Sequence, residues 1–120
     1  MAKANQQSVR FVRWQGGQHP TPTLMKQNLE KFGLHVFKWQ QQANYRFGTR
    51  SHGYSKSLYC VEGSLEVFIP DTRERFTLRV GDRLDIANGV RHSITVGLGG
   101  AVCFEGTPAD RRLVAAAGKF

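Results

Sequence analysis

Long apolar runs are absent from this 120-residue sequence, and its opening residues 1–8 are polar. A membrane span needs about 20 consecutive apolar residues, and a secretory signal needs an apolar stretch of about 7–15. We therefore expect a soluble, cytoplasmic protein with no membrane partner. Low-complexity tracts and internal repeats are also missing, and 40% of the residues are hydrophobic. This composition predicts one ordinary folded domain rather than a disordered chain.

Cysteine is scarce as well. Only Cys60 and Cys103 occur, without the CxxC spacing of a redox or zinc site. Both lie in apolar, strand-like runs, so we expect two reduced and buried thiols rather than a disulfide.

Acidic side chains are few, with nine Asp and Glu against 17 Lys and Arg and a formal net charge of +8. A positive protein can associate with nucleic acid, membrane surfaces or acidic small molecules. However, the arginines between residues 73 and 83 are interleaved with Glu74 and Asp82, as on a solvated sheet face. No zinc finger, helix-turn-helix pair or RNA-binding aromatic motif is present. Nucleic-acid binding therefore stands as an alternative that rests on charge alone.

One helix is predicted near the start of the chain. Thr21 can cap it, Pro22 suits its first turn, and Gly33 follows as a stop. Leu24, Met25, Leu29 and Phe32 would form one apolar face over residues 22–32. This helix and a weak preceding strand should cover the barrel described below or contribute to a homodimer interface.

From residue 34 onward the hydrophobic pattern alternates with a period of two, which indicates β-strands. Glycine, proline and Asn-Gly turn signals separate the short runs, a pattern typical of a sandwich or closed barrel. The predicted strands cover residues 35–41, 43–47, 57–61, 64–69, 75–80, 83–86, 92–96 and 101–105.

Two segments carry glycine and histidine in a pattern that resembles the two motifs of the cupin superfamily. In the first, the family places Gly, His-x-His, Glu and Gly. The matching positions of this chain hold Asn44, Arg50, His52, Lys56 and Gly63.

The second motif has Gly, Pro, Gly, His and Asn in the family, and here those positions hold Gly81, Ala87, Gly89, His92 and Val96. The resemblance covers about residues 43–105. It implies an all-β fold, a cupin-type double-stranded β-helix (jelly-roll barrel) with one short N-terminal helix. The domain layout would be an N-terminal strand and helix extension over residues 1–33, the barrel over 34–106 and a C-terminal tail over 107–120.

In metal-dependent cupins three His and one Glu bind a divalent ion, so the departures in this chain bear on function. Arg50 and Lys56 stand where two ligands would be, leaving His52 and His92. A guanidinium cannot ligate a cation, and a nearby ammonium repels it: two unit charges ~4 Å apart repel by about 4 kcal/mol at an effective dielectric of 20. We expect no cofactor. A weaker divalent-metal site at His52 and His92 with waters is kept as an alternative, in a cupin oxygenase or isomerase.

If the barrel places these residues as the family does, Arg50, His52, Lys56 and His92 converge in one mouth. Such a cluster would attract a small anionic molecule such as a carboxylate, phosphate or enolate. Tyr54 could donate a hydrogen bond to this ligand or pack at the rim. His52 and His92 are the candidates to move a proton if the protein is an enzyme.

The opposing interpretation is an ordinary basic rim. In it Arg50 and Lys56 would point to solvent or pair with Glu62 or Glu105, and Glu105 is the best acidic candidate to balance Lys56. Isolated charge clusters often prove to be structural networks.

Overall fold

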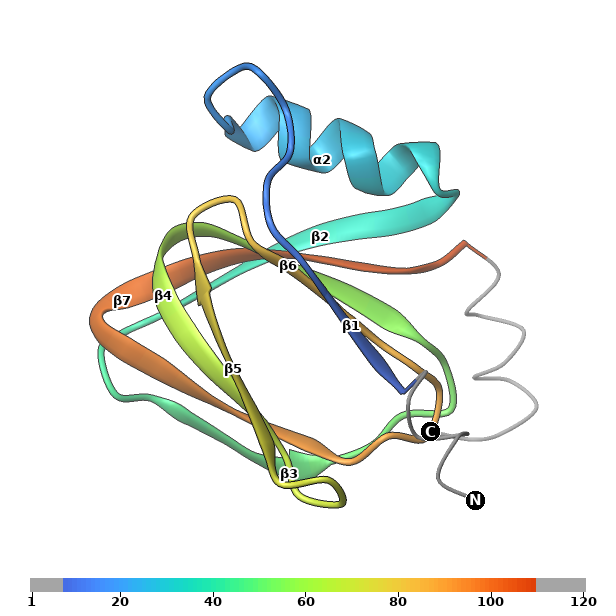
Figure 1. Cartoon of the computed structure of the whole chain (residues 1–120), viewed down its shortest axis with the longest axis vertical. Helices are drawn as coiled ribbons and strands as arrows, with labels where there is room; N and C mark the ends of the chain where they lie inside the picture. The colour runs from blue at the N-terminus through green and yellow to red at the C-terminus, as the bar shows by residue number, and fades with distance from the viewer. Residues whose placement is uncertain (1–7, 110–120) are drawn as a thin grey trace.

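The computed structural model describes residues 8–109 and shows a barrel of β-strands with one helix lying across its outside (Figure 1). The expected C-terminal tail falls outside the described residues from residue 110 onward. Of the residues described, no helix has the length and apolarity that crossing a bilayer requires. In chain order the elements are β1 Val9–Val12, α2 Pro22–Lys31, β2 Leu34–Gln41, β3 Arg46–Arg50, β4 Lys56–Ile69, β5 Glu74–Arg79, β6 Arg83–Ile86 and β7 His92–Pro108.

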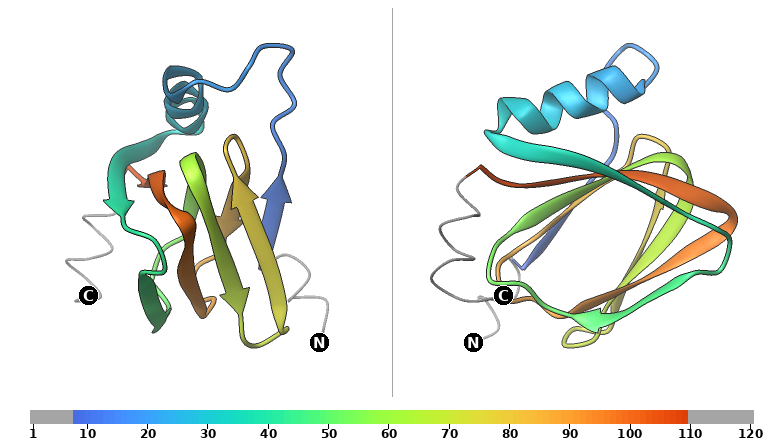
Figure 2. Two further views of the ribbon diagram at one scale, coloured as in Figure 1. Left: turned by 90° about the vertical axis from the view of Figure 1, so that its left-hand side faces the viewer. Right: turned by 180° about the vertical axis from the view of Figure 1, so that it is seen from behind.

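Two long strands, β4 and β7, form the frame of the barrel. All strand pairs are antiparallel, in the order β1-β6-β4-β7-β2, with β3 added to β7 and β5 added to β4. Figure 2 shows how β4 and β7 bend together, so that their two halves contribute to opposite walls. β1, from the expected N-terminal extension, pairs with β6, and β7 continues past residue 106 to Pro108. The predicted all-β barrel with one short helix is confirmed.

Several turn signals proved to be bends within continuous strands. The predicted strands 57–61 and 64–69 are one strand, β4, and 92–96 and 101–105 are both part of β7. Gly63 lies at the bend of β4 with φ 74°, and a Cβ there would stand 2.0 Å from the carbonyl oxygen of Gly100. The glycine is needed because the two bent strands touch backbone to backbone at this point.

The predicted strand 43–47 also has different bounds in the structure. β3 begins at Arg46, because Asn44 adopts a left-handed turn with φ 67°. Asparagine tolerates this conformation better than most residues. It therefore performs here the conformational role that the cupin motif gives to glycine.

The helix forms as the sequence predicts. Thr21 caps it, its hydroxyl oxygen accepting a hydrogen bond from the Leu24 N–H at 3.2 Å. Met25 and Leu29 are fully buried against the outer side of β4 and β2. Phe32 was predicted on the same apolar face, but it lies beyond the last helical residue and is 58% exposed. The helix thus covers the barrel, and the homodimer stays a prediction.

The first half of β4 is buried on both faces, which explains why it reads as a continuous apolar run. Leu58 and Cys60 point into the barrel, whereas Tyr59 and Val61 point outward to the helix. Cys60 and Cys103 are cross-strand partners, both buried and reduced, as the sequence predicted. The barrel core fills one end of the interior with side chains of β4 to β7 and leaves the other end open as a cavity.

Candidate functional site

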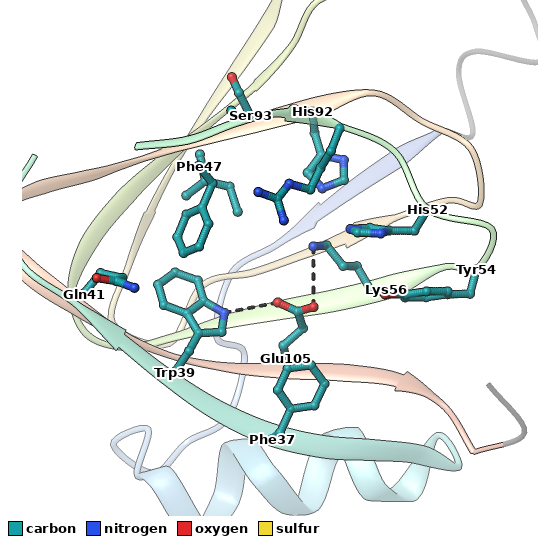
Figure 3. Close-up of a pocket in the computed structure, with 13 residues that line it drawn as sticks. Phe37, Trp39, Gln41, Phe47, His52, Tyr54, Lys56, His92, Ser93 and Glu105 are labelled. Atoms are coloured by element: carbon teal, nitrogen blue, oxygen red, sulfur yellow. Dashed lines mark hydrogen bonds and ion pairs between the residues drawn. The ribbon is translucent and has the colours of Figure 1, made fainter. Parts of the chain in front are cut away.

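The open end of the barrel holds a cavity of about 300 Å³, between β2, β3 and the starts of β4 and β7 (Figure 3). All five residues predicted to bind a ligand line it. The complete lining is Phe37, Trp39, Gln41, Phe47, Gly48, Arg50, His52, Tyr54, Lys56, His92, Ser93, Ile94 and Glu105. The structure therefore brings the predicted residues together in one concave site.

Arg50 reaches the cavity because of an irregularity in β3. Phe47 pairs with Ile94 and Arg50 pairs with His92, so β3 advances three residues where β7 advances two. The extra residue is a β-bulge, which re-aims the side chains that follow it. Without the bulge Thr49 would stand opposite His92. The guanidinium of Arg50 lies 5.8 Å from the centre of the Phe47 ring.

Lys56, the first residue of β4, forms a buried ion pair with Glu105 of β7. Its Nζ lies 3.5 Å from Glu105 Oε2, and the two side chains are only 6% and 11% exposed. The indole Nε1–H of Trp39 donates to the other carboxylate oxygen at 3.1 Å (Figure 3). Burial lowers the pKa of Lys56, and the charge of Arg50 lowers it further, while Glu105 acts in the opposite direction. The opposing interpretation of the sequence, in which Lys56 pairs with Glu105, thus holds for this one residue.

His92 is 2% exposed and has its ring fixed by the backbone. Its Nδ1 lies 2.9 Å from the carbonyl oxygen of Val90. Because a carbonyl oxygen only accepts, Nδ1 carries the hydrogen and the neutral ring keeps a lone pair on Nε2. Burial lowers the pKa of His92 to about 4, and the nearby Lys56, His52 and Arg50 lower it as well. At neutral pH this side chain is an uncharged acceptor.

The Nε2 atom of His92 has no hydrogen-bond partner. Of the described residues, one other buried side-chain atom shares this condition, Oγ1 of Thr107, which does not line the cavity. A buried polar group without a partner costs about 1–3 kcal/mol. The structure therefore bears an unsatisfied acceptor in the wall of the site.

His52 and Tyr54 form the rim beside Lys56. Their rings are stacked with centroids 5.0 Å apart, and the His52 ring centre lies 5.6 Å from that of His92. The backbone N–H of Gly89 donates to the carbonyl oxygen of His52 at 2.9 Å. This bond joins the loops of the two motifs and fixes His52 near His92.

The cavity does not fit a standard metal site. Within residues 8–109 no three His, Cys, Asp or Glu side chains form a group that could hold an ion. Arg50 and Lys56 bring positive charge to the same wall as His52 and His92, and Glu105 is already paired with Lys56. A weaker site at the two histidines stays a prediction, which elemental analysis of protein purified without chelator tests.

An apolar wall was missed in the sequence. Trp39 of β2 and Phe47 of β3 pack edge to face in the cavity wall, with ring centroids 5.0 Å apart and an interplanar angle of 64°. Alternation along β2 puts Phe37 and Trp39 on one face, but alternation alone cannot tell which face is inside. The pocket therefore has aromatic rings beside its basic groups, with the Arg50 guanidinium close to the Phe47 ring.

Known proteins resemble this chain in structure but not closely in sequence. No protein-family model and no curated protein matches it. An RmlC-like cupin from Shewanella frigidimarina is similar over 68% of this chain and 71% of its own, with 21% identity and a TM-score of 0.56. A cupin-2 domain protein from the same organism shares 18% identity over 63% of this chain and 71% of its own, with a TM-score of 0.54.

A third similar structure is the polyketide cyclase RemF from Streptomyces resistomycificus. It has 14% identity and a TM-score of 0.58, covering 85% of this chain and 66% of its own. The antiparallel double-stranded β-helix, the two motifs and these neighbours define the fold class as a cupin barrel. The chain thus has the fold of a small cupin-type barrel, and the likeness establishes its fold alone.

Proposed function

We propose that this protein binds a small anionic metabolite in the mouth of its barrel. The observation that carries the proposal is the position of Arg50 in the cavity wall with no counter-ion. Among the described residues, no carboxylate lies within ion-pair distance of its guanidinium, whereas the charge of Lys56 is matched by Glu105.

An arginine in this setting is suited to a carboxylate or phosphate. Its planar guanidinium can donate two parallel hydrogen bonds to such a group. Arg50 is exposed at the open end of the cavity, so its guanidinium is accessible to an anion that enters from solvent. Lys56, His52 and Tyr54 add donors around the same space. The basic residues of the site therefore favour an anion over a cation.

A screen of carboxylates, sugar acids and sugar phosphates tests the proposal. At ten times its Kd, a ligand should raise the melting temperature by about 5 °C, because binding to the native state stabilises it. Calorimetry would then give Kd for wild type and Arg50→Ala. We expect the substitution to weaken binding at least tenfold, the usual scale for a lost charge-assisted hydrogen bond.

Arg46→Ala is the matched control. Arg46 lies on the same strand and is exposed, but it does not line the cavity. Both substitutions remove one positive charge, so a general effect of net charge would weaken binding equally in both. Equal affinities for wild type and Arg50→Ala would show that the anion binds elsewhere.

A further inference from the structure

The charged side chains that line the cavity sum to one positive charge. Of the described lining residues, Arg50 and Lys56 are cationic and Glu105 is acidic. Histidine is ordinarily neutral above its pKa of about 6.5, and burial lowers the pKa of His92 to about 4. Above neutral pH the wall therefore carries a net charge equal to that of Arg50 alone.

Glu105 is held in the wall as a fixed negative charge. Its side chain is 11% exposed, and Lys56 Nζ lies 3.5 Å from its Oε2 atom. The indole Nε1–H of Trp39 donates to Oε1 at 3.1 Å, so each oxygen of the carboxylate has a partner (Figure 3). An ionised carboxylate only accepts hydrogen bonds, and two such partners suit it. The positive charge of Lys56 is therefore already matched within the protein.

These three charges act on the same small space. Burial lowers the pKa of Lys56, Glu105 raises it and Arg50 lowers it, so both groups lie within electrostatic reach of the ammonium. The cavity that they share has a volume of about 300 Å³, at the small end of ligand pockets. An anion bound at Arg50 is therefore attracted by two cations and repelled by Glu105.

A second negative charge on the ligand would lack a counter-ion in this cavity. The attraction of an ion to the wall grows in proportion to its charge, whereas the Born cost of removing it from water grows as the square of its charge. A dianion therefore loses about four times as much hydration free energy as a monoanion for about twice the attraction. With one net positive charge, the wall favours the monoanion.

We propose that the site selects singly charged anions, such as carboxylates and sulfate esters, over doubly charged phosphate esters, and that Glu105 sets this selectivity. The inference rests on the proposed anion-binding function and specifies the charge of the ligand that the same site takes.

Phenyl sulfate and phenyl phosphate are matched probes for this selectivity. Both have a phenyl ring, an ester oxygen and three terminal oxygens, but the sulfate carries one negative charge. The phosphate carries two at pH 8, because the second pKa of a phosphate ester is about 6. Calorimetry on the full chain at pH 8, in a buffer free of phosphate and sulfate, should show phenyl sulfate binding about tenfold more tightly than phenyl phosphate.

Removing the carboxylate should weaken this preference. Glu105→Gln leaves the charges of Arg50 and Lys56 unopposed, so we expect the ratio of the two dissociation constants to move about tenfold or more towards phenyl phosphate. Adding Lys56→Met should restore the preference for phenyl sulfate. Glu62→Gln is the matched control, since Glu62 is exposed on β4 and does not line the cavity, and it should keep the wild-type ratio. An unchanged ratio in Glu105→Gln would overturn the role of Glu105.

A pH series on wild type gives a readout that does not depend on a variant folding. As the pH falls from 8 to 5, phenyl phosphate takes up a proton and becomes singly charged, while phenyl sulfate does not change. The titratable and charged groups of the wall are Arg50, His52, Tyr54, Lys56, His92 and Glu105. They act on both probes, so the ratio of the affinities reports the charge of the ligand. We expect this ratio to fall from about tenfold at pH 8 towards one at pH 5.

A ratio near one at pH 8, tighter binding of phenyl phosphate, or no binding of phenyl sulfate would overturn the inference. If both probes bind equally and both are weakened by Arg50→Ala, the anion site stands and the charge selectivity is wrong. If Arg50→Ala weakens neither, the anion site itself is wrong. If neither probe binds, the charge selectivity is again wrong, and the effect of Arg50→Ala on ligands from the wider screen decides the anion site.

Discussion

Acidification should destabilise this protein through the single buried ring of His92. In the folded state its pKa is about 4, chiefly because of burial. In the unfolded chain a histidine has a pKa of about 6.5. Between these values the unfolded state binds a proton that the folded state does not. The free energy of unfolding therefore falls as the pH is lowered from about 6.5 to 4, and below 4 this contribution stays constant.

The size of the effect follows from the difference between the two pKa values of His92. At about 1.4 kcal/mol per pH unit, lowering the pH from 6.5 to 4 should cost about 3 kcal/mol. Domains of this size are stable by only about 5–15 kcal/mol, so the loss is measurable. The charged groups near the ring are Lys56, Arg50 and His52. Lys56 and Arg50 are cationic at acidic pH, so their repulsion of a charged His92 persists across this range.

Urea unfolding at a series of pH values, on wild type and His92→Asn, isolates the contribution of this ring. The other titratable groups are the same in both proteins, so their effects largely cancel in the difference between the curves. The variant should lose less stability than wild type between pH 6.5 and 4. Parallel curves would refute the reasoning, because they would show that the ring is protonated in the folded state as readily as in the unfolded chain. His35→Asn, at an exposed position, should follow wild type.

Three further outcomes are expected. In denaturant unfolding, Gly63→Ala should lower the free energy of unfolding by more than about 2 kcal/mol, because the new Cβ would meet the Gly100 carbonyl and the φ of this residue is positive. Gly99 has open space around it, so Gly99→Ala should cost less than about 1 kcal/mol. Glu105→Gln should lower the free energy of unfolding by about 3 kcal/mol, because it leaves the Lys56 ammonium buried and unpaired. Adding Lys56→Met should recover most of that loss. Equal stability of the single and double variants would contradict this prediction. Burial raises the pKa of both cysteine thiols, so a thiol-specific disulfide reagent should modify the native protein only at the rate at which it opens, and immediate labelling would contradict their burial.

Much of the fold could be predicted because local patterns report directly on it. The Thr21 cap and the stop at Gly33 define the helix, and two-residue alternation identifies the strands. The errors arose where backbone conformation depends on contacts distant in sequence. Gly63 looks like a turn residue, yet it allows one strand to bend against another. A glycine needed for a close contact and a glycine needed for a turn look alike in the sequence.

The candidate site was harder to predict from the sequence than the fold was. Arg50 enters the cavity through a β-bulge, and nothing in residues 46–50 signals which residue is the extra one. Its position could be anticipated only from the resemblance of the motif to cupins. Trp39 lies on a strand outside both motifs and joins the site through its bond to Glu105, a contact made by folding. The spacing of the motif residues can therefore predict the cluster of basic residues, but the aromatic residues of the cavity wall can be identified only from the structure.

Arg50 and Lys56, which stand at positions that resemble the metal-ligand positions of cupins, differ in whether a carboxylate of the protein neutralises them. Lys56 could not remain as an ammonium in this wall without a nearby carboxylate, and Glu105 supplies one while Trp39 holds the other oxygen. This network leaves Arg50 as the charge that no carboxylate of the described chain neutralises, and it helps keep His92 neutral. Lys56 is therefore satisfied within the protein, and Arg50 is the residue of the cavity wall at which the proposed anion would bind.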